Sequence, residues 1–385
     1  MLATHRANAD SPELEKERGI TRRVLFVDHC TPTPREDAGS VVAFEVMQGF
    51  IANGYKVTFI PEDNFAHMGA DTRELQRLGI EAIYHPAYSR MPAFLSARAD
   101  PFDVIFVHRF GVGDAHMAAL RKKYPAARIL FLNADMHYLR ELREAQLSGD
   151  AGAKENALRT RDRELRVIAQ ADVALVHSEF EYDLLRRELP QTHAVLFPLI
   201  HDPVDTVASL SARTGVCFVG GFRHPPNADG IVWFVEQAWP LVLAQQPEAK
   251  LHIVGSHMTP QVHALAQHRG VQVVGFVEEL DGFLARRRVS VAPLRYGAGA
   301  KGKVAASLAQ GLPVVCTPIA AEGMQLTPGA NVLVGDSPQA LAQHVVTLLA
   351  DDAAWQRLSA NGLDYARALT SRASAHERLR RILEA

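Results

Sequence analysis

Cysteine is scarce in this chain of 385 residues, and long apolar runs are missing. The three cysteines, Cys30, Cys217 and Cys316, are odd in number and far apart, which favours core thiols in a reduced, cytosolic protein over a disulfide framework. No apolar run reaches the roughly 18 residues that cross a bilayer. Residues 1–21 are polar and lack the apolar segment of a secretory signal, so we expect a mobile extension there.

An excess of charge of either sign is also missing. Lys and Arg number 41 against 43 Asp and Glu, so the overall charge gives no electrostatic reason to expect a nucleic-acid partner. Three catalytic patterns are absent from the sequence: a His-Glu zinc helix, paired Cys-x-x-Cys and Gly-x-Ser-x-Gly. No Asp-x-Asp follows a predicted strand, so neither a bound metal nor a resident cofactor is predicted.

The sequence does contain short apolar runs that alternate with longer helical patterns. Several runs of the first half are apolar throughout, as expected for strands that are covered on both faces. Helical patterns such as 39–53 and 152–170 lie between them, which indicates βαβ units and a doubly wound parallel sheet. The strands predicted in this half are 23–28, 56–61, 81–85, 103–108, 128–133, 173–177 and 194–198.

This alternation pauses over the polar segment 199–215 and then resumes. We therefore place a domain boundary near 200–213, with a second α/β domain after it. Two such domains leave a cleft, and ligands of these sheets bind at the carboxyl ends of the strands. The strands predicted in the second half are 216–220, 250–254, 271–275, 289–293, 313–317 and 332–335, and the tail from 337 onward is helical.

The run "YGAGAKGKVAASLAQG" is the most informative stretch, because it places two lysines at the start of a predicted helix. A helix N-terminus is already positive, so Lys301 and Lys303 are unfavourable there unless an anion is bound. Gly297 and Gly299 can turn backbone amides toward one point and form an anion nest. The alternative is a flexible glycine turn with two solvated lysines.

A second loop, "VGGFRHPPNADG", ends the first strand of the second domain. Gly221, Arg223 and His224 follow that strand and are expected to face the same cleft as the two lysines. Asn227 comes after two prolines and is predicted to cap the next helix.

Two loops of the first domain are candidates for the opposite wall of the cleft. Gly39 and Ser40 open a helix and form a second plausible anion site, or they belong to a long surface loop. Asp135 and His137 follow the strand 128–133. The alternative for His137 is a structural role.

These motifs together resemble a retaining glycosyltransferase of the GT-B fold, of the large family 4 (glycosyl transferases group 1). The resemblance extends from about residue 23 to 384 and is strongest in "FVGGFRHPPNADGIVWFVEQAWPLV", "LHIVG", "VQVVGFVEEL" and "VAPLRYGAGAKGKVAASLAQGLPVVCTPIAAEGM". The segments "RVLFVDHCTPTPREDAGS" and "DMHYLRELREAQLSGD" resemble the branch that builds bacterial surface polysaccharides.

The resemblance implies two doubly wound Rossmann-like domains with an interdomain cleft. The polar extension would cover 1–21, and an acceptor-side domain would cover 22–205. The domain that binds the nucleotide sugar would cover 206–368, and a last helix, 369–385, would return to the N-terminal domain.

The resemblance also implies roles for individual residues. The donor diphosphate would lie against the 297–303 loop, the loop 318–324 would approach the sugar, and the start of the 39–53 helix would lie near the phosphates. The implied catalytic residues are His137, Asp135 and Lys301. The implied donor-binding residues are Gly39, Ser40, Gly221, Arg223, His224, Gly297, Gly299, Lys301, Lys303, Glu322, Gly323 and Met324.

The implied function is metal-independent transfer of a sugar, with retention, from a nucleotide-sugar donor to a glycan or lipid-linked acceptor in cell-surface polysaccharide synthesis. The protein would be cytoplasmic, with peripheral association with the inner membrane face. The family commonly carries two glutamates, separated by seven residues, where this chain has Ala298 and Ala306. The missing glutamates favour one alternative, a non-catalytic nucleotide-sugar or glycan-binding relative. A sugar-nucleotide epimerase of the same fold, which would need no acceptor, is the other.

Overall fold

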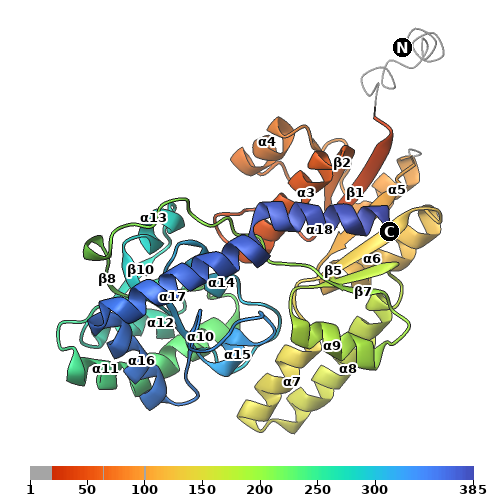
Figure 1. The fold of residues 1–385 in the computed structure, drawn as a ribbon. Coiled ribbons are helices and arrows are strands. Elements are labelled where there is room, and N and C mark those ends of the chain that lie inside the picture. The colour runs from red at the N-terminus through yellow and green to blue at the C-terminus, as the bar shows by residue number, and fades with distance from the viewer. Residues whose placement is uncertain (1–19, 64, 99–100) are drawn as a thin grey trace.

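The computed structural model describes residues 20–63, 65–98 and 101–385. They form two α/β domains, each built on one parallel sheet, with the C-terminal helix lying against the N-terminal domain (Figure 1). Residues 1–19 of the predicted extension lie outside the described part of the chain. Of the helices described, none is long and apolar enough to cross a membrane.

The N-terminal sheet has seven parallel strands in the order β3-β2-β1-β4-β5-β6-β7. Its central strands are buried on both faces: Val24 and Phe26 pack toward one side, and Leu25 and Val27 pack toward the other. This is why the sequence shows continuous apolar runs. The strands are β1 (Arg22–Asp28), β2 (Tyr55–Pro61), β3 (Glu81–Ala82), β4 (Val104–His108), β5 (Arg128–Asn133), β6 (Val173–Val176) and β7 (Ala194–Leu196).

Helices cover both faces of this sheet. The first, α3 (Ala38–Ala52), lies on one face, and the antiparallel pair α7 (His137–Ser148) and α8 (Ala151–Ile168) projects from the end of the domain (Figure 1). The remaining helices are α4 (Ala70–Arg77), α5 (Met91–Ala97), α6 (Phe110–Lys123) and α9 (Glu179–Glu188).

The C-terminal sheet has six parallel strands in the order β10-β9-β8-β11-β12-β13. Every predicted strand of both halves overlaps an observed one, although the strand predicted at 81–85 is limited to Glu81–Ala82. The strands are β8 (Thr214–Val219), β9 (Leu251–Val254), β10 (Val271–Gly275), β11 (Arg287–Ala292), β12 (Val314–Cys316) and β13 (Leu333–Val334).

The helix that follows β8 corrects one prediction. Asn227 does not cap it, because α10 (Pro225–Trp233) already begins at the two prolines, with His224 as its N-cap residue. Proline is well suited to the first turn of a helix, where its missing N–H would have no intrahelical partner. The other helices are α11 (Trp239–Gln245), α12 (Pro260–Ala264), α13 (Leu280–Leu284), α14 (Gly302–Ala309), α15 (Pro318–Ala321), α16 (Pro338–Ala350), α17 (Asp352–Tyr365) and α18 (Arg372–Glu384).

The end of the chain joins the two domains. From α17 it passes through a π-helical turn into α18, which packs along α3 (Figure 1). Arg372 forms a bidentate ion pair with Glu45 at 2.6 and 2.8 Å, and Arg378 donates to the carbonyl of Leu196 at 2.7 Å. The last helix is therefore held on the N-terminal domain by both charge and packing.

Candidate active site

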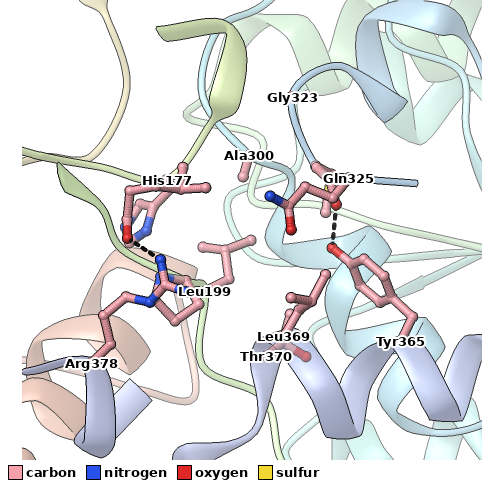
Figure 2. A pocket seen from close by; sticks show the side chains of 12 residues that line it. His177, Leu199, Ala300, Gly323, Gln325, Tyr365, Leu369, Thr370 and Arg378 are labelled. Atoms are coloured by element: carbon pink, nitrogen blue, oxygen red, sulfur yellow. Dashed lines mark hydrogen bonds between the residues drawn. The ribbon is translucent and has the colours of Figure 1, made fainter. Parts of the chain in front are cut away.

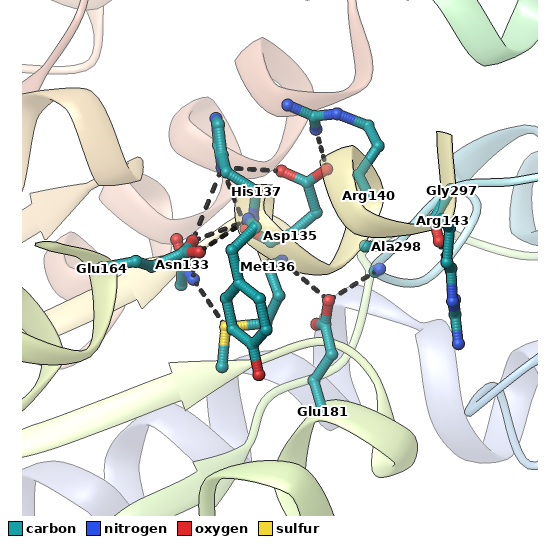
Figure 3. A network of polar contacts seen from close by, with 12 residues as sticks. Asn133, Asp135, Met136, His137, Arg140, Arg143, Glu164, Glu181, Gly297 and Ala298 are labelled. Carbon is teal, nitrogen blue, oxygen red and sulfur yellow. Dashed lines mark hydrogen bonds and ion pairs between the residues drawn. The ribbon is translucent and has the colours of Figure 1, made fainter. Parts of the chain in front are cut away.

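The carboxyl ends of the two sheets face each other, and the loops that follow β5 and β11 touch across the cleft. From the N-terminal domain come Asp135 and His137, and from the C-terminal domain comes Gly297 (Figure 3). Gly299 and Lys301 follow in the same loop. A Cβ atom added to Gly299 would lie 2.9 Å from Cβ of Asp135. The two loops are therefore as close as backbone and side chain allow, and only glycine fits at this position, where φ is +69°.

A buried carboxylate sets the start of α7. Glu164 of α8 accepts hydrogen bonds from the backbone N–H groups of His137 at 2.9 Å and Tyr138 at 3.0 Å, and from Nδ2 of Asn133 at 2.8 Å (Figure 3). It thereby satisfies first-turn amides of α7. Glu164 is fully buried, although most of its neighbours in the mixed-charge run 159–166 are exposed or half-buried.

Asp135 and His137 form an ion pair beside this helix start. Nδ1 of His137 lies 3.2 Å from Oδ1 of Asp135, and Arg140 donates to the other oxygen (Figure 3). Burial opposes ionisation of Asp135, but Arg140 and His137 outweigh it and keep its pKa below the usual value. Burial would likewise lower the pKa of His137, but Glu164 and Asp135 together raise it. The result is a charged pair at the edge of the cleft.

The glycine-rich loop does not present an open nest. The N–H of Gly299 donates to a carboxylate oxygen of Glu181 at 2.8 Å, so a side chain of the protein occupies that amide. Lys301 is the N-cap residue of α14, and its amine donates to the carbonyls of Ala298 at 3.0 Å and of Gly299. Lys301 therefore holds the shape of the loop as well as supplying charge.

Lys303 occupies a different place, in the first turn of α14. Its amine donates to the side-chain oxygen of Asn227 and lies 4.4 Å from the centre of the Phe218 ring. Burial, and then the charge of Lys301, lower the pKa of Lys303 to about 7. Asn227 in turn donates to the carbonyl of Gly221 at 2.7 Å, which links Lys303 to the loop before α10.

The two neighbouring residues of that loop differ in exposure. Arg223 is exposed, whereas His224 is half-buried. Burial, and then the charge of Arg140, lower the pKa of His224 to about 4. His224 thus meets the Asp135–Arg140 pair from the opposite domain as a neutral imidazole.

The loop after β12 docks on the N-terminal domain. Glu322 forms a bidentate ion pair with Arg143 at 2.8 Å, and Arg143 also donates to the carbonyl of Gly297 at 2.7 Å. The carbonyl of Gly323 accepts from the N–H of Glu179 at 2.9 Å. Sulfur of Met324 accepts from the N–H of Lys301 at 3.4 Å. All three predicted residues of this loop therefore lie in the interdomain seam.

The Asp37 side chain caps the N-terminus of α3. Asp37 accepts from the N–H of Ser40 at 2.9 Å and from its hydroxyl at 2.5 Å. The guanidinium of Arg109 lies so close to Gly39 that an added Cβ atom would meet it at 2.8 Å. The sequence placed Gly39 and Ser40 correctly at a helix start, and the structure adds Arg109 as the nearby cation.

The first helix turns of the two domains also face each other. A Cβ atom added to Gly302, the first residue of α14, would lie 2.9 Å from Cβ of Ala38, the first residue of α3. The positive ends of both helix dipoles therefore converge on the cleft. Lys303 and Arg109 lie beside these helix starts, with Arg109 paired to Asp28 and Asp37, and the arrangement can stabilise a bound diphosphate.

A small hollow lies on the other side of the 297–303 loop, between the domains (Figure 2). It is lined mainly by apolar groups, with His177 and Arg378 on one wall and Tyr365 on the other (Figure 2). Nδ1 of His177 is bonded to the carbonyl of Phe197 at 2.9 Å. Among residues 20–63, 65–98 and 101–385, no group of three or more His, Cys, Asp or Glu side chains could hold a metal ion.

Part of the chain matches a known family model. Residues 213–351, which contain the whole second sheet, match the family model "Glycosyl transferases group 1". An uncharacterized 44.6 kDa protein in the cps region of Klebsiella pneumoniae is 22% identical over 185 residues. That alignment covers 46% of this chain and 46% of the relative, so the chain matches less than half the length of this curated protein.

Two solved structures cover almost the whole chain. Sucrose-phosphate synthase from Thermosynechococcus elongatus aligns with a TM-score of 0.73 and 18% identity over 94% of this chain and 98% of its own. The Anabaena protein Alr3699/HepE in complex with UDP and glucose aligns with a TM-score of 0.67 and 13% identity over 94% and 99%. These likenesses confirm the predicted GT-B fold. The match of residues 213–351 to the family model supports a glycosyltransferase.

Proposed function

We propose that this protein transfers a sugar, with retention of anomeric configuration, from a nucleotide-sugar donor to a glycan or lipid-linked acceptor. The observation that carries the proposal is the convergence of the α3 and α14 N-termini and Lys303 opposite the Asp135–His137 pair. That arrangement offers positive charge to a diphosphate and polar groups to the sugar next to it. The Anabaena structure with UDP and glucose supports a nucleotide-sugar donor.

In this proposal the C-terminal domain holds the donor. Lys303, Arg223 and the amides at the start of α14 bind the diphosphate, with Gly221 and His224 shaping the wall of the site. Gly297, Gly299 and Lys301 form the floor. Glu322, Gly323 and Met324 lie next to the sugar. Gly39 and Ser40, with Arg109, approach the phosphates from the N-terminal domain when the cleft closes.

The reaction breaks the bond between the anomeric carbon and the phosphate oxygen, and the diphosphate leaves with the bonding electrons. The acceptor hydroxyl forms the new bond on the same face of the sugar and gives its proton to the departing phosphate oxygen. Because negative charge grows on the diphosphate, cations and amide groups fixed around it lower the barrier. His137, held by Asp135, is placed to donate a hydrogen bond at this stage, and Lys301 keeps the loop in position.

We also propose a cellular setting for the reaction. Synthesis of cell-surface polysaccharide on the cytoplasmic side of the inner membrane fits a lipid-linked acceptor and a peripheral association with that membrane. The location of the Klebsiella relative in a cps region supports this role.

A thermal-shift screen of nucleoside diphosphate sugars tests whether such a donor binds. Ligand at 100 times its dissociation constant stabilises the folded state by about 2.7 kcal/mol, so the correct donor is expected to raise the melting temperature by several degrees. Nucleosides and free sugars serve as controls. A complete panel of sugar nucleotides that leaves the melting temperature unchanged would contradict the proposal.

Turnover is expected to be independent of divalent metal. Positive charge at the diphosphate comes from Lys303, Arg223 and two helix ends, so a metal ion is not needed to neutralise it. Addition of EDTA is expected to change the rate by less than about twofold. A loss of more than about tenfold that manganese or magnesium restores would show that the enzyme needs a metal.

Ala306→Glu is expected to lower stability without tightening donor binding. Ala306 is partly buried and packs on an apolar cluster that contains Phe283 and Leu312, so a carboxylate there loses part of its hydration. The cost of about 1–3 kcal/mol corresponds to a fall in melting temperature of roughly 2–12 °C. Ala306→Gln separates charge from size. A Glu variant that keeps its melting temperature and binds the nucleotide more tightly would instead show that the usual ribose pocket of the family is retained.

A further inference from the structure

Glu181 of α9 has a buried carboxyl group that joins the loops following β5 and β11. Its Oε1 accepts the N–H of Met136 at 2.8 Å and the N–H of Gly299 at 2.8 Å (Figure 3). Met136 stands between Asp135 and His137 in the N-terminal domain. Gly299 stands two residues before Lys301 in the C-terminal domain. One oxygen atom therefore fixes the donor loop relative to the proposed catalytic pair.

Burial of the Glu181 carboxyl group costs free energy, which is not expected of a residue whose only role is to stabilise the fold. Its side chain is 1% exposed, and within the described part of the chain Oε2 has no hydrogen-bond partner. Burial raises the pKa of Glu181 and lowers the pKa of Lys301, and the attraction between the two groups opposes both shifts. A buried carboxylate that accepts bonds at one oxygen only carries a desolvation cost that an apolar residue would avoid.

The other contacts across the seam have a different character. Arg143 and Glu322 are each partly exposed, and the bond between Gln325 and Glu179 is exposed. These contacts hold the two domains together around the edge of the interface. Unlike these two pairs, the Glu181 carboxyl group accepts hydrogen bonds from backbone N–H groups on both sides of the proposed reaction centre.

We infer that Glu181 is a positioning residue for sugar transfer, which aligns the 297–301 loop with Asp135 and His137 when the domains close. This inference rests on the proposed function. Displacement of a reacting group by about 1 Å can cost on the order of a hundredfold in rate. Loss of the Glu181 bridge therefore affects turnover much more than it affects binding of the diphosphate.

Three variants and one control separate geometry from general stability. Glu181→Gln keeps an oxygen that can accept both amides, whereas Glu181→Ala removes the bridge. Glu181→Asp keeps the charge but is one methylene too short, and it replaces the Ala variant if that protein does not fold. Glu188→Gln is the matched control, because Glu188 lies on the same helix but pairs with Arg161 inside the N-terminal domain.

The first readout is amide hydrogen exchange, which needs no substrate. The N–H groups of Met136 and Gly299 are expected to be protected in the wild type, in Glu181→Gln and in the control, and to exchange faster at both positions in Glu181→Ala. The second readout is kinetic. Glu181→Ala is expected to lower kcat about ten- to a hundredfold and to change the dissociation constant of the nucleoside diphosphate by less than about threefold, with most of kcat restored in Glu181→Gln.

Three results would overturn the inference. The first is unchanged exchange at both amides in Glu181→Ala, and the second is an unchanged kcat in an active enzyme. A kcat equally low in the Gln and Ala variants would also overturn it, because the charge and not the bridge would then matter. If wild type transfers no sugar from any donor, the proposed function fails. The exchange data still decide whether Glu181 ties the two loops together.

Discussion

Lys303→Ala is expected to weaken binding of a nucleoside diphosphate about ten- to a hundredfold and to leave binding of the nucleoside within about twofold. The amine of Lys303 lies at the first turn of α14, beside Asn227 and the ring of Phe218, and the proposed function places the diphosphate at this turn. A charge-assisted hydrogen bond contributes about 1.5–3 kcal/mol, which corresponds to this range of affinity. Titration calorimetry with the diphosphate and the nucleoside measures both effects.

Lys301→Ala provides a comparison inside the same loop. The amine of Lys301 is bonded to the carbonyls of Ala298 and Gly299, so its removal is expected to loosen the loop and to lower both affinity and stability. Lys250→Ala is the control, because this exposed lysine lies at the amino end of β9, whereas the proposed site lies at the carboxyl ends of the strands. Equal diphosphate affinity in wild type and both loop variants would show that the loop is a glycine turn whose lysines bind no ligand.

The affinity for a nucleotide sugar is also expected to fall as the pH rises from about 6 to about 8.5. Burial lowers the pKa of Lys303 to about 7, so the amine is protonated below this pH and loses its charge above it. A nucleotide sugar is the right probe, because neither of its esterified phosphates titrates in this range. The dependence on pH should largely disappear in Lys303→Met; if it persists there, another group is responsible.

His137→Ala is expected to lower kcat by roughly 10²–10³ while the nucleoside diphosphate binds with nearly unchanged affinity. Nδ1 of His137 faces Asp135 at 3.2 Å, so Nε2 is the atom available to a substrate. Glu164 and Asp135 raise the pKa of His137 against the effect of burial, which favours the protonated ring as a hydrogen-bond donor. Removal of one such donor to developing charge costs about 2.7–4 kcal/mol.

Steady-state kinetics at saturating donor measure the effect of His137→Ala. His137→Gln keeps a donor group and is expected to recover part of the rate. His193→Ala is the control, because His193 is exposed at the amino end of β7, away from the cleft. A kcat within about threefold of wild type in His137→Ala would assign His137 a structural role.

The sequence predicted the elements of the fold well, because strands that are covered on both faces must be apolar throughout. The runs that became β1, β4 and β5 have this property. The error at Asn227 has a local cause: two prolines before it suggested a boundary, yet both fit into the first turn of α10.

The site was predicted in part. Residues at the carboxyl ends of strands were found because a parallel sheet brings these ends together. Glu164 and Glu181 were missed, since a glutamate in a mixed-charge helical pattern gives no sign of burial. Glu181 bonds to Gly299, 118 residues away, and only the docking of the two domains creates that contact.

The loop 297–303 shows the same limit. Its glycines indicated an anion nest, and the structure does place a hydrogen-bond acceptor at Gly299, but the acceptor is the Glu181 carboxyl group. Spacing alone cannot distinguish an amide that awaits a ligand from one that binds a side chain of another domain. Lys303 is the residue of this loop for which the expected role and the observed position agree best.

The most direct test of the account is release of nucleoside diphosphate from the donor, with and without a lipid-linked saccharide acceptor. We expect release only when acceptor is present, with the sugar recovered on the acceptor in its original anomeric configuration. We also expect turnover to be largely lost in Lys303→Ala. Conversion of one nucleotide sugar into another without acceptor would indicate an epimerase. Tight donor binding with neither release nor conversion, against acceptors prepared from several surface polysaccharides, would indicate a binding protein and contradict the proposed transfer.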